Sequence, residues 1–280
     1  MDRHVLGLSG GKDSAALAIY MSHNHPELDI EYFFTDTGEE LPEVYEFLNK
    51  LEGFLGNGKK IKKLNPGRDF KHYLAKNNGF LPAAHARWCT INLKLKPFKA
   101  WVNEFLKQGD TVYSYVAIRS DEDYREGYVS NDDNLIVKLP FREDKIDKQG
   151  VLDILDSSGI GLPKYYDWRS RSGCTFCFFQ QKIEWVRLRE IHPEAFENAK
   201  ALEKNALEHG SPFTWSNDES LEDLEKPERI AQIKADYEKR VEREKNRKDK
   251  YVNPLRINIV DIDDLYGVDE GNGSCNICHK

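Results

Sequence analysis

The sequence predicts an α/β protein with a mostly parallel, doubly wound sheet, followed by a helical extension that contains cysteines. Three observations support this fold class. Short apolar runs alternate with helical patterns in the first half of the chain, an order typical of parallel sheets covered by helices. A glycine-rich turn joins the first apolar run to the first helical pattern. The 280 residues, 39% of them hydrophobic, suffice for one sizeable core and a smaller appendage.

The first half of the chain is expected to contain four strands and three helices. Apolar residues at helical spacing predict the helices, and short apolar runs predict the strands. In chain order we expect a strand at 4–8, a helix at 15–21, a strand at 29–35, a helix at 41–55, an edge strand at 59–64, an amphipathic helix at 98–106 and a strand at 111–118.

The pattern changes after about residue 140. We expect a short strand at 134–141, a short helix around 151–155, a helical region at 183–207 interrupted by Pro193, a loop at 211–220 and a highly charged helix at 227–250. These features predict a nucleotide-binding domain at 1–207 and a charged helical extension at 208–280, which carries a second pair of cysteines.

The turn Ser9-Gly10-Gly11-Lys12-Asp13-Ser14 is the strongest functional signal. A strand, a glycine-rich turn and a helix N-terminus in this order form an anion site, because backbone N–H groups converge there and the helix dipole favours negative charge. Lys12 adds a positive charge, and the serine hydroxyls are hydrogen-bond donors. The spacing is shorter than in the common Gly-x-x-x-x-Gly-Lys-Ser phosphate loop. The turn therefore predicts phosphate binding without specifying a reaction.

Two further polar groups follow predicted strands. Asp36 and Thr37 come after the second strand, and Arg119 comes after the strand at 111–118. Because ligands in parallel sheets bind beyond the carboxyl ends of the strands, we expect these residues to share one edge with the glycine-rich turn. Arg119 suits a phosphate, whereas Asp36 suits Mg²⁺, a ribose hydroxyl or the capping of a turn.

The five cysteines include two Cys-x-x-Cys pairs, Cys174/Cys177 and Cys275/Cys278. Such spacing favours metal or redox chemistry over structural disulfides in an intracellular chain. Cys89 can join Cys174 and Cys177 as a third thiolate. Three thiolates suit a [4Fe–4S] cluster, with zinc as an alternative, and reduced core cysteines remain a third interpretation.

Several segments together resemble the PP-loop nucleotide α-hydrolase superfamily and, within it, the phosphoadenosine phosphosulfate (PAPS) reductase family. The resemblance covers roughly residues 4–195. It rests on Ser9–Ser14, on Asp36-Thr37-Gly38 with Leu41-Pro42-Glu43, on Arg87-Trp88-Cys89-Thr90, on Ala117-Ile118-Arg119-Ser120-Asp121-Glu122, and on Gly173-Cys174-Thr175-Phe176-Cys177. The Arg-Trp-Cys-Thr segment, with its Lys94-x-x-Pro97 continuation, is also similar to the iron–sulfur sulfurtransferase subunit of DNA phosphorothioation systems.

The resemblance implies an adenine nucleotide α-hydrolase-like fold and an ATP-using sulfurtransferase. ATP activates an acceptor with release of AMP and pyrophosphate, Mg²⁺ bridges the phosphates, and sulfur arrives through an iron–sulfur cluster or a cysteine. Lys12 and Asp13 are the expected catalytic residues of the loop, with Cys275 and Cys278 as candidate sulfur carriers. A nucleic acid is the candidate acceptor. A cysteine desulfurase or thiol donor protein is the candidate sulfur source.

Two alternatives remain open. A thiol-dependent reductase of PAPS or adenylyl sulfate needs a nucleophilic cysteine, for which Cys275 and Cys278 are candidates, although the tail lacks the family's Glu-Cys-Gly-Leu-His pattern. A nucleotide-binding module without turnover is the third interpretation. The sequence shows no membrane span and no secretory pattern, so we expect a cytoplasmic protein, with the oligomeric state open.

Overall fold

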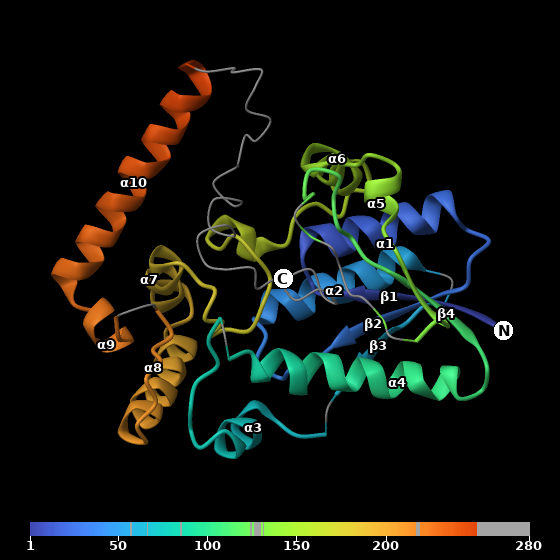
Figure 1. Ribbon diagram of the computed structural model, residues 1–280. Helices are drawn as coiled ribbons and strands as arrows, with labels where there is room; N and C mark the ends of the chain where they lie inside the picture. The colour runs from blue at the N-terminus through green and yellow to red at the C-terminus, as the bar shows by residue number, and fades with distance from the viewer. Residues whose placement is uncertain are drawn as a thin grey trace. The chain divides into compact units, whose positions relative to one another are not determined.

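The computed structural model describes residues 1–56, 58–65, 67–84, 86–123, 125, 130, 132–216 and 219–250 (Figure 1). These residues form two compact units. The first contains residues 1–73 and 88–174, and the second contains residues 74–87 together with the described chain from 175 onward. The division expected between residues 207 and 208 stays a prediction.

A parallel sheet forms the centre of the first unit. Its strands are β1 (Asp2–Leu8), β2 (Ile30–Thr35), β3 (Ile61–Leu64), β4 (Thr111–Tyr115) and β5 (Leu135–Lys138). Their order is β3-β2-β1-β4-β5, and each adjacent pair is parallel. The predicted α/β class and the edge position of β3 are confirmed. The strands β2 and β3 are added on one side of β1, and the chain then returns to add β4 and β5 on the other side. A ligand crevice is expected at this switch point, beyond the carboxyl end of β1.

Helices cover both faces of this sheet, as the sequence predicts. On one face, α1 (Lys12–Asn24) packs against α2 (Pro42–Leu55) and α6 (Lys148–Ser157), and on the other lies α4 (Lys96–Leu106) (Figure 1). The α4 face is apolar because Phe98, Trp101 and Val102 recur at helical spacing. Phe98 stacks on Phe33 of β2 with ring centroids 5.1 Å apart.

Short elements connect the larger ones. They are α3 (Phe70–Lys76), the π-helix η1 (Thr90–Leu95), α5 (Pro140–Glu143) and the 3₁₀ helix η2 (Lys164–Asp167). The strand predicted at 134–141 ends at Lys138 because Pro140 has no N–H for the ladder and instead begins α5. The strand predicted at 111–118 ends at Tyr115, although the Val116 N–H still donates to the Lys138 carbonyl.

The second unit is helical in its described part, with α7 (Lys182–Ile191), α8 (Pro193–Glu208), α9 (Leu221–Leu224) and α10 (Pro227–Lys250). The predicted break at Pro193 is confirmed, since this residue occupies the first turn of α8. Buried Glu203 accepts hydrogen bonds from the backbone N–H groups of Trp215 and Leu221. These bonds tie the loop at 211–220 to α8. No helix in the described chain combines the length and apolarity needed to cross a bilayer.

Candidate functional site

The turn between β1 and α1 has a backbone that needs its glycines. Gly10 has a φ of +72°, and a Cβ there would lie 2.5 Å from Cγ1 of Val44. A Cβ on Gly11, the N-cap of α1, would lie 3.0 Å from the Ser172 hydroxyl. A side chain at either position would therefore be too close to neighbouring atoms. At Gly10 it would also strain the backbone, because φ is positive there.

The two serines of the turn hold its shape. The Ser14 hydroxyl accepts the Ser9 N–H at 3.1 Å and lies 3.3 Å from the Gly11 carbonyl, to which it donates. The Ser9 hydroxyl accepts the Gly11 N–H at 3.2 Å. Both hydroxyls thus bond within the turn, and they fix the direction of the backbone groups at the N-terminus of α1.

Lys12, Asp13 and Arg119 form one charged cluster beside this turn. Asp13 accepts hydrogen bonds from Lys12 Nζ at 2.9 Å and from Arg119 Nη1 at 3.1 Å. Arg119 also donates to Asp121 at 2.9 Å. Its side chain is only 4% exposed, so the guanidinium is fixed in position. The expected meeting of the turn with Arg119 at one edge of the sheet is therefore confirmed.

The cluster keeps both cations charged. Burial alone raises the pKa of Asp13, but Lys12 and Arg119 outweigh burial and hold that pKa well below its usual range. Burial likewise opposes the charge on Lys12, yet the Asp13 carboxylate raises the pKa of the lysine above its ordinary value. Two buried positive charges therefore persist beside the start of α1. Asp13 contacts both of them, and Asp121 and Glu122 add negative charge beside Arg119.

Two tyrosines that the sequence analysis did not assign to the site contact the turn from η2. Tyr165, which is fully buried, donates its hydroxyl to the Gly10 carbonyl at 2.7 Å. The Tyr166 hydroxyl accepts the Lys12 N–H at 3.3 Å. The sequence signal available for Tyr165 was its place two residues after Pro163, at the end of a loop that contains glycine and proline. The Lys12 N–H, one of the donors expected to meet an anion, thus has a hydroxyl acceptor here.

Asp36 follows β2 at the same edge of the sheet. Its carboxylate accepts hydrogen bonds from the Tyr45 hydroxyl at 2.7 Å and from the Gly38 N–H at 2.9 Å. The second bond is the turn-capping role that the sequence left open for this residue. Lys63 Nζ lies 3.9 Å from the carboxylate. Asp36 is thus anchored in a turn at the expected edge.

Cys174 lies in the first unit, next to Thr37 and Glu40. Its Sγ is 3.3 Å from the Thr37 hydroxyl and 3.7 Å from Glu40 Oε1, and its backbone pairs with that of Glu40. Buried Arg169 donates to the Cys174 carbonyl at 3.0 Å. The adjacent Ser172 hydroxyl lies 3.4 Å from the Ser9 hydroxyl. The cysteine segment and the glycine-rich turn are therefore packed side by side.

The remaining cysteines are placed differently. Cys89 precedes η1 in the first unit, and Cys177 belongs to the second unit; neither these two nor Cys174 forms a disulfide. Among the described residues, no three His, Cys, Asp or Glu side chains are grouped closely enough to hold a metal ion. Because the expected ligands Cys89, Cys174 and Cys177 belong to two different units, their role as a ligand set stays a prediction. Within the first unit, the Cys174 thiol contacts oxygen atoms of Thr37 and Glu40. Cys275 and Cys278 lie outside the described residues.

Residues 3–128 match the family model described as the phosphoadenosine phosphosulfate reductase domain. This range contains the glycine-rich turn, Asp36, Cys89 and Arg119.

Two curated proteins of Methanocaldococcus jannaschii are similar to the chain, both described as uncharacterized. MJ0066 is 34% identical over 225 residues, which cover 75% of this chain and 44% of that protein. MJ0973 is 28% identical over 198 residues, covering 67% of this chain and 44% of that protein. The chain spans less than half the length of these relatives.

Two solved structures align with the fold. A phosphoadenylyl-sulfate (PAPS) reductase from Candida auris, in a phosphate complex, has a TM-score of 0.47 and 14% identity, covering 61% of this chain and 81% of that chain. The U34-tRNA thiolase NcsA from Methanococcus maripaludis, solved with its [4Fe-4S] cluster, has a TM-score of 0.41 and 15% identity, covering 74% and 72%.

Proposed function

We propose that the turn Ser9–Ser14 binds the phosphates of an adenine nucleotide for catalysis. The match of residues 3–128 to the phosphoadenosine phosphosulfate reductase domain model supports this proposal. The observation that carries it is the pair of charged cations, Lys12 and Arg119, held on the two oxygens of Asp13 beside the N-terminus of α1. An entering phosphate brings more negative charge than the Asp13 carboxylate, so it competes with Asp13 for both cations, while Asp121 still holds Arg119.

The proposed reaction is ATP-dependent sulfur transfer to an acceptor, with a nucleic acid as the candidate. An acceptor oxygen attacks the α-phosphorus of ATP, the bond between the α- and β-phosphates breaks, and pyrophosphate leaves. Lys12 and the N–H groups at the start of α1 stabilise the charge that develops on pyrophosphate. Mg²⁺, when bound, neutralises phosphate charge, and Asp36 is the candidate side chain to hold it. The product of this step is an adenylated acceptor.

Sulfur then replaces the adenylated oxygen. A persulfide on Cys275 or Cys278 attacks the carbon that bears this oxygen; the carbon–oxygen bond breaks, and AMP leaves with the bonding electrons. The other cysteine of the pair then attacks the sulfur–sulfur bond, which releases the thiolated product and leaves a Cys275–Cys278 disulfide. A thiol donor protein reduces this disulfide, and a sulfur donor renews the persulfide.

The proposed sulfur transfer uses cysteine chemistry and does not require an iron–sulfur cluster. The three predicted ligands of a cluster belong to two units, Cys89 and Cys174 to the first and Cys177 to the second. The Cys174 thiol contacts Thr37 and Glu40. Ligation of a cluster or of zinc by these cysteines stays a prediction, and iron analysis tests it.

A second candidate is thiol-dependent reduction of PAPS or adenylyl sulfate, which the family match favours. The same turn would bind the nucleotide, and a cysteine thiolate would attack the sulfonyl sulfur. The nucleotide leaves with its phosphate oxygen, and an S-sulfocysteine forms. A second thiolate then releases sulfite and forms a disulfide.

One experiment separates these candidates. The full chain is incubated with ATP, Mg²⁺, a sulfane-sulfur donor, a dithiol and a mixture of transfer RNA and DNA, and in parallel with PAPS or adenylyl sulfate and a dithiol. Pyrophosphate release that depends on the nucleic acid supports sulfur transfer, whereas sulfite release supports reduction. Binding of nucleotide without either product contradicts both. Lys12→Ala is expected to abolish product formation, and Lys164→Ala, at an exposed position, serves as the matched control.

A further inference from the structure

Positive charge is concentrated in one part of the first unit. Residues 59–73 and 88–107 contain ten lysine or arginine residues and only two acidic ones, Asp69 and Glu104, in a chain whose net charge is −7. Four of the ten basic residues lie in the edge strand β3 and in α4, and the other six lie in the segments next to these elements. A local basic surface on an acidic protein favours a polyanionic partner, because the rest of the molecule repels it.

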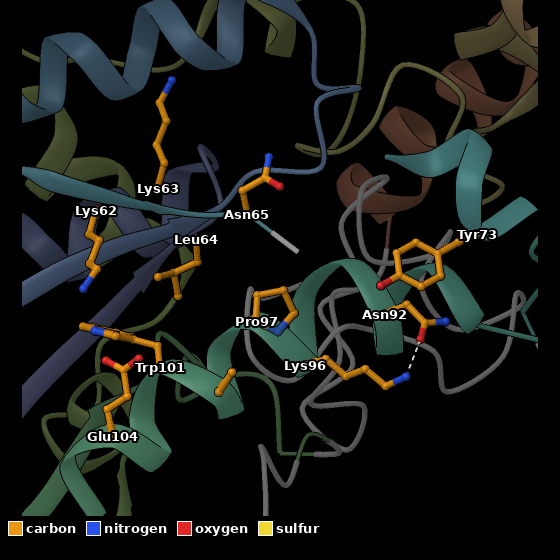
Figure 2. A pocket seen from close by; sticks show the side chains of 11 residues that line it. Lys62, Lys63, Leu64, Asn65, Tyr73, Asn92, Lys96, Pro97, Trp101 and Glu104 are labelled. Carbon is orange, nitrogen blue, oxygen red and sulfur yellow. Dashed lines mark hydrogen bonds between the residues drawn. The ribbon is translucent and has the colours of Figure 1, made fainter. Parts of the chain in front are cut away.

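A pocket of about 430 Å³ lies between β3 and α4 in this basic region (Figure 2). Its size is in the range of small-molecule sites. Lysines, amides and aromatic side chains line it, and Glu104 is the acidic residue among them. Figure 2 shows Lys62 and Lys63 projecting from opposite sides of β3, with Lys62 directed toward Trp101. The pocket therefore combines positive charge with flat side chains.

Two of the lining lysines have charges available for a ligand. Lys62 Nζ lies 5.0 Å from the centroid of the Trp101 ring, and Lys96 Nζ donates to Asn92 Oδ1 at 2.6 Å. Within the described part of the chain, no carboxylate is within ion-pair distance of either ammonium. Lys60, by contrast, is paired with Glu52 at 2.8 Å. Both Lys62 and Lys96 are exposed, so an anion can reach them.

Neutral hydrogen-bonding groups complete the pocket. Trp101 is 4% exposed, and its indole N–H has no acceptor among the described residues. The Asn65 amide also lines the pocket, with its Oδ1 accepting the Gly67 N–H, and the Asn92 Oδ1 accepts from Lys96. Tyr73 adds a phenol ring to the lining. Amides and ring N–H groups bind base edges and sugar hydroxyls, and a phenol ring can stack on a base.

We propose that this β3–α4 pocket binds single-stranded polynucleotide, with Lys62 and Lys96 on phosphates of the strand and an unstacked nucleotide in the pocket. A single strand is favoured over a duplex because a base must leave its stack to enter a concave site. The role of this surface, which is to deliver the acceptor, rests on the proposed function. Polynucleotide binding by the pocket does not depend on the proposed function, since neither Lys62 nor Lys96 belongs to the nucleotide-binding turn.

The test measures binding of the full chain to fluorescent single-stranded RNA, single-stranded DNA and a duplex of equal length, as a function of salt. Lys62→Ala/Lys96→Ala is expected to weaken single-strand binding by roughly 10- to 30-fold at about 0.1 M salt. The slope of log K against log[salt] should decrease by about 1.4, since each phosphate contact on a single strand contributes about 0.7. Lys63 is left unchanged because it lies near Asp36.

The control Lys164→Ala/Lys204→Ala removes the same charge from exposed positions outside the pocket, and it should bind as the wild type does. The proposal is overturned if the wild type binds no polynucleotide, or if Lys62→Ala/Lys96→Ala binds it as tightly as the control variant does. It is also overturned if a duplex binds as tightly as a single strand, or if free mononucleotides compete as well as the polymer. Lys12→Ala should retain polynucleotide binding. A wild type that binds polynucleotide but turns over no ATP contradicts only the sulfur-transfer proposal.

Discussion

The Arg119 guanidinium lies 3.1 Å from the Asp13 carboxylate, although 106 residues separate the two along the chain. The contact joins the first turn of α1 to the segment that follows β4. Asp13 also holds Lys12 at 2.9 Å. Asp13 thereby holds two cations beside the N-terminus of a helix, where an anion is stabilised, and Asp121 is a second carboxylate on Arg119. Phosphate binding then requires competition with the Asp13 carboxylate.

Acid should remove the stabilisation that Asp13 provides. Lys12 and Arg119 hold its pKa in the folded chain well below the ordinary value of about 3.9. Because the unfolded chain binds this proton more readily, the stabilisation is complete above the ordinary pKa and is lost as the pH falls from about 5 through the folded pKa. Urea unfolding between pH 3 and 7 should show a steeper loss for the wild type than for Asp13→Asn. Equal slopes would contradict the assigned contact. Asp153→Asn, at an exposed position of α6, controls for removal of a carboxylate.

Gly10→Ala should be more destabilising than Gly38→Ala. Both glycines have positive φ, so either alanine costs about 1–2 kcal/mol of backbone strain. A Cβ at Gly10 would also lie 2.5 Å from Val44 Cγ1, whereas nothing lies within 4 Å of a Cβ at Gly38. We expect Gly10→Ala to lower the free energy of unfolding by a further ~1–3 kcal/mol, as overpacking does. Chemical denaturation measures both, and Gly10→Ala/Val44→Ala should recover part of the difference. An equal loss of unfolding free energy in Gly38→Ala would contradict the predicted clash with Val44.

Tyr165→Phe and Tyr166→Phe should affect nucleotide binding in opposite directions. Tyr165→Phe removes the donor to the buried Gly10 carbonyl and should lower both stability, by about 1–3 kcal/mol, and nucleotide affinity. Tyr166→Phe removes the acceptor of the Lys12 N–H. A phosphate no longer has to displace that hydroxyl, so affinity should rise a few-fold. Isothermal titration of both variants with an ATP analogue distinguishes these outcomes, and equal changes would exclude the competing role of Tyr166.

Anaerobic purification with iron and zinc analysis tests the predicted metal ligands. If Cys89, Cys174 and Cys177 hold a [4Fe–4S] cluster, the protein should contain about four irons per chain, and serine at any of the three positions should lower the iron content. Stoichiometric zinc would overturn the cluster. A variant that keeps its full metal content removes its cysteine from the ligand set.

The strand, turn and first helix could be predicted because their signals are local. Val5 to Leu8, the two glycines and the alanine-rich start of α1 lie within twenty consecutive residues. The edge position of β3 was also predictable, since its lysine-rich sequence suits a strand with one unpaired side. The shared edge of the glycine-rich turn and Arg119 followed from a general rule, that parallel strands place their carboxyl ends at one edge. The ion pair of Arg119 with Asp13 was not predicted.

Contacts between distant segments could not be predicted in the same way. Tyr166 reaches the Lys12 N–H across 154 positions, and no periodicity encodes that contact. The pairing of Glu40 with Cys174 likewise depends on how loops close over the sheet. Residues 74–87 belong to the second unit, although no local signal in the sequence separates them from their neighbours. Their assignment depends on packing between segments that are far apart in the chain.

The most direct measurement of the central claim is isothermal titration of the full chain with a non-hydrolysable ATP analogue and with pyrophosphate. The wild type should bind both. Lys12→Met should weaken binding by roughly 10- to 100-fold, because one hydrogen-bonded charge contributes about 1.5–3 kcal/mol. Lys164→Met, at an exposed position of η2, should bind as the wild type does. An unchanged affinity in Lys12→Met, or no binding by the wild type, would contradict the assignment of Ser9–Ser14 as the phosphate-binding turn.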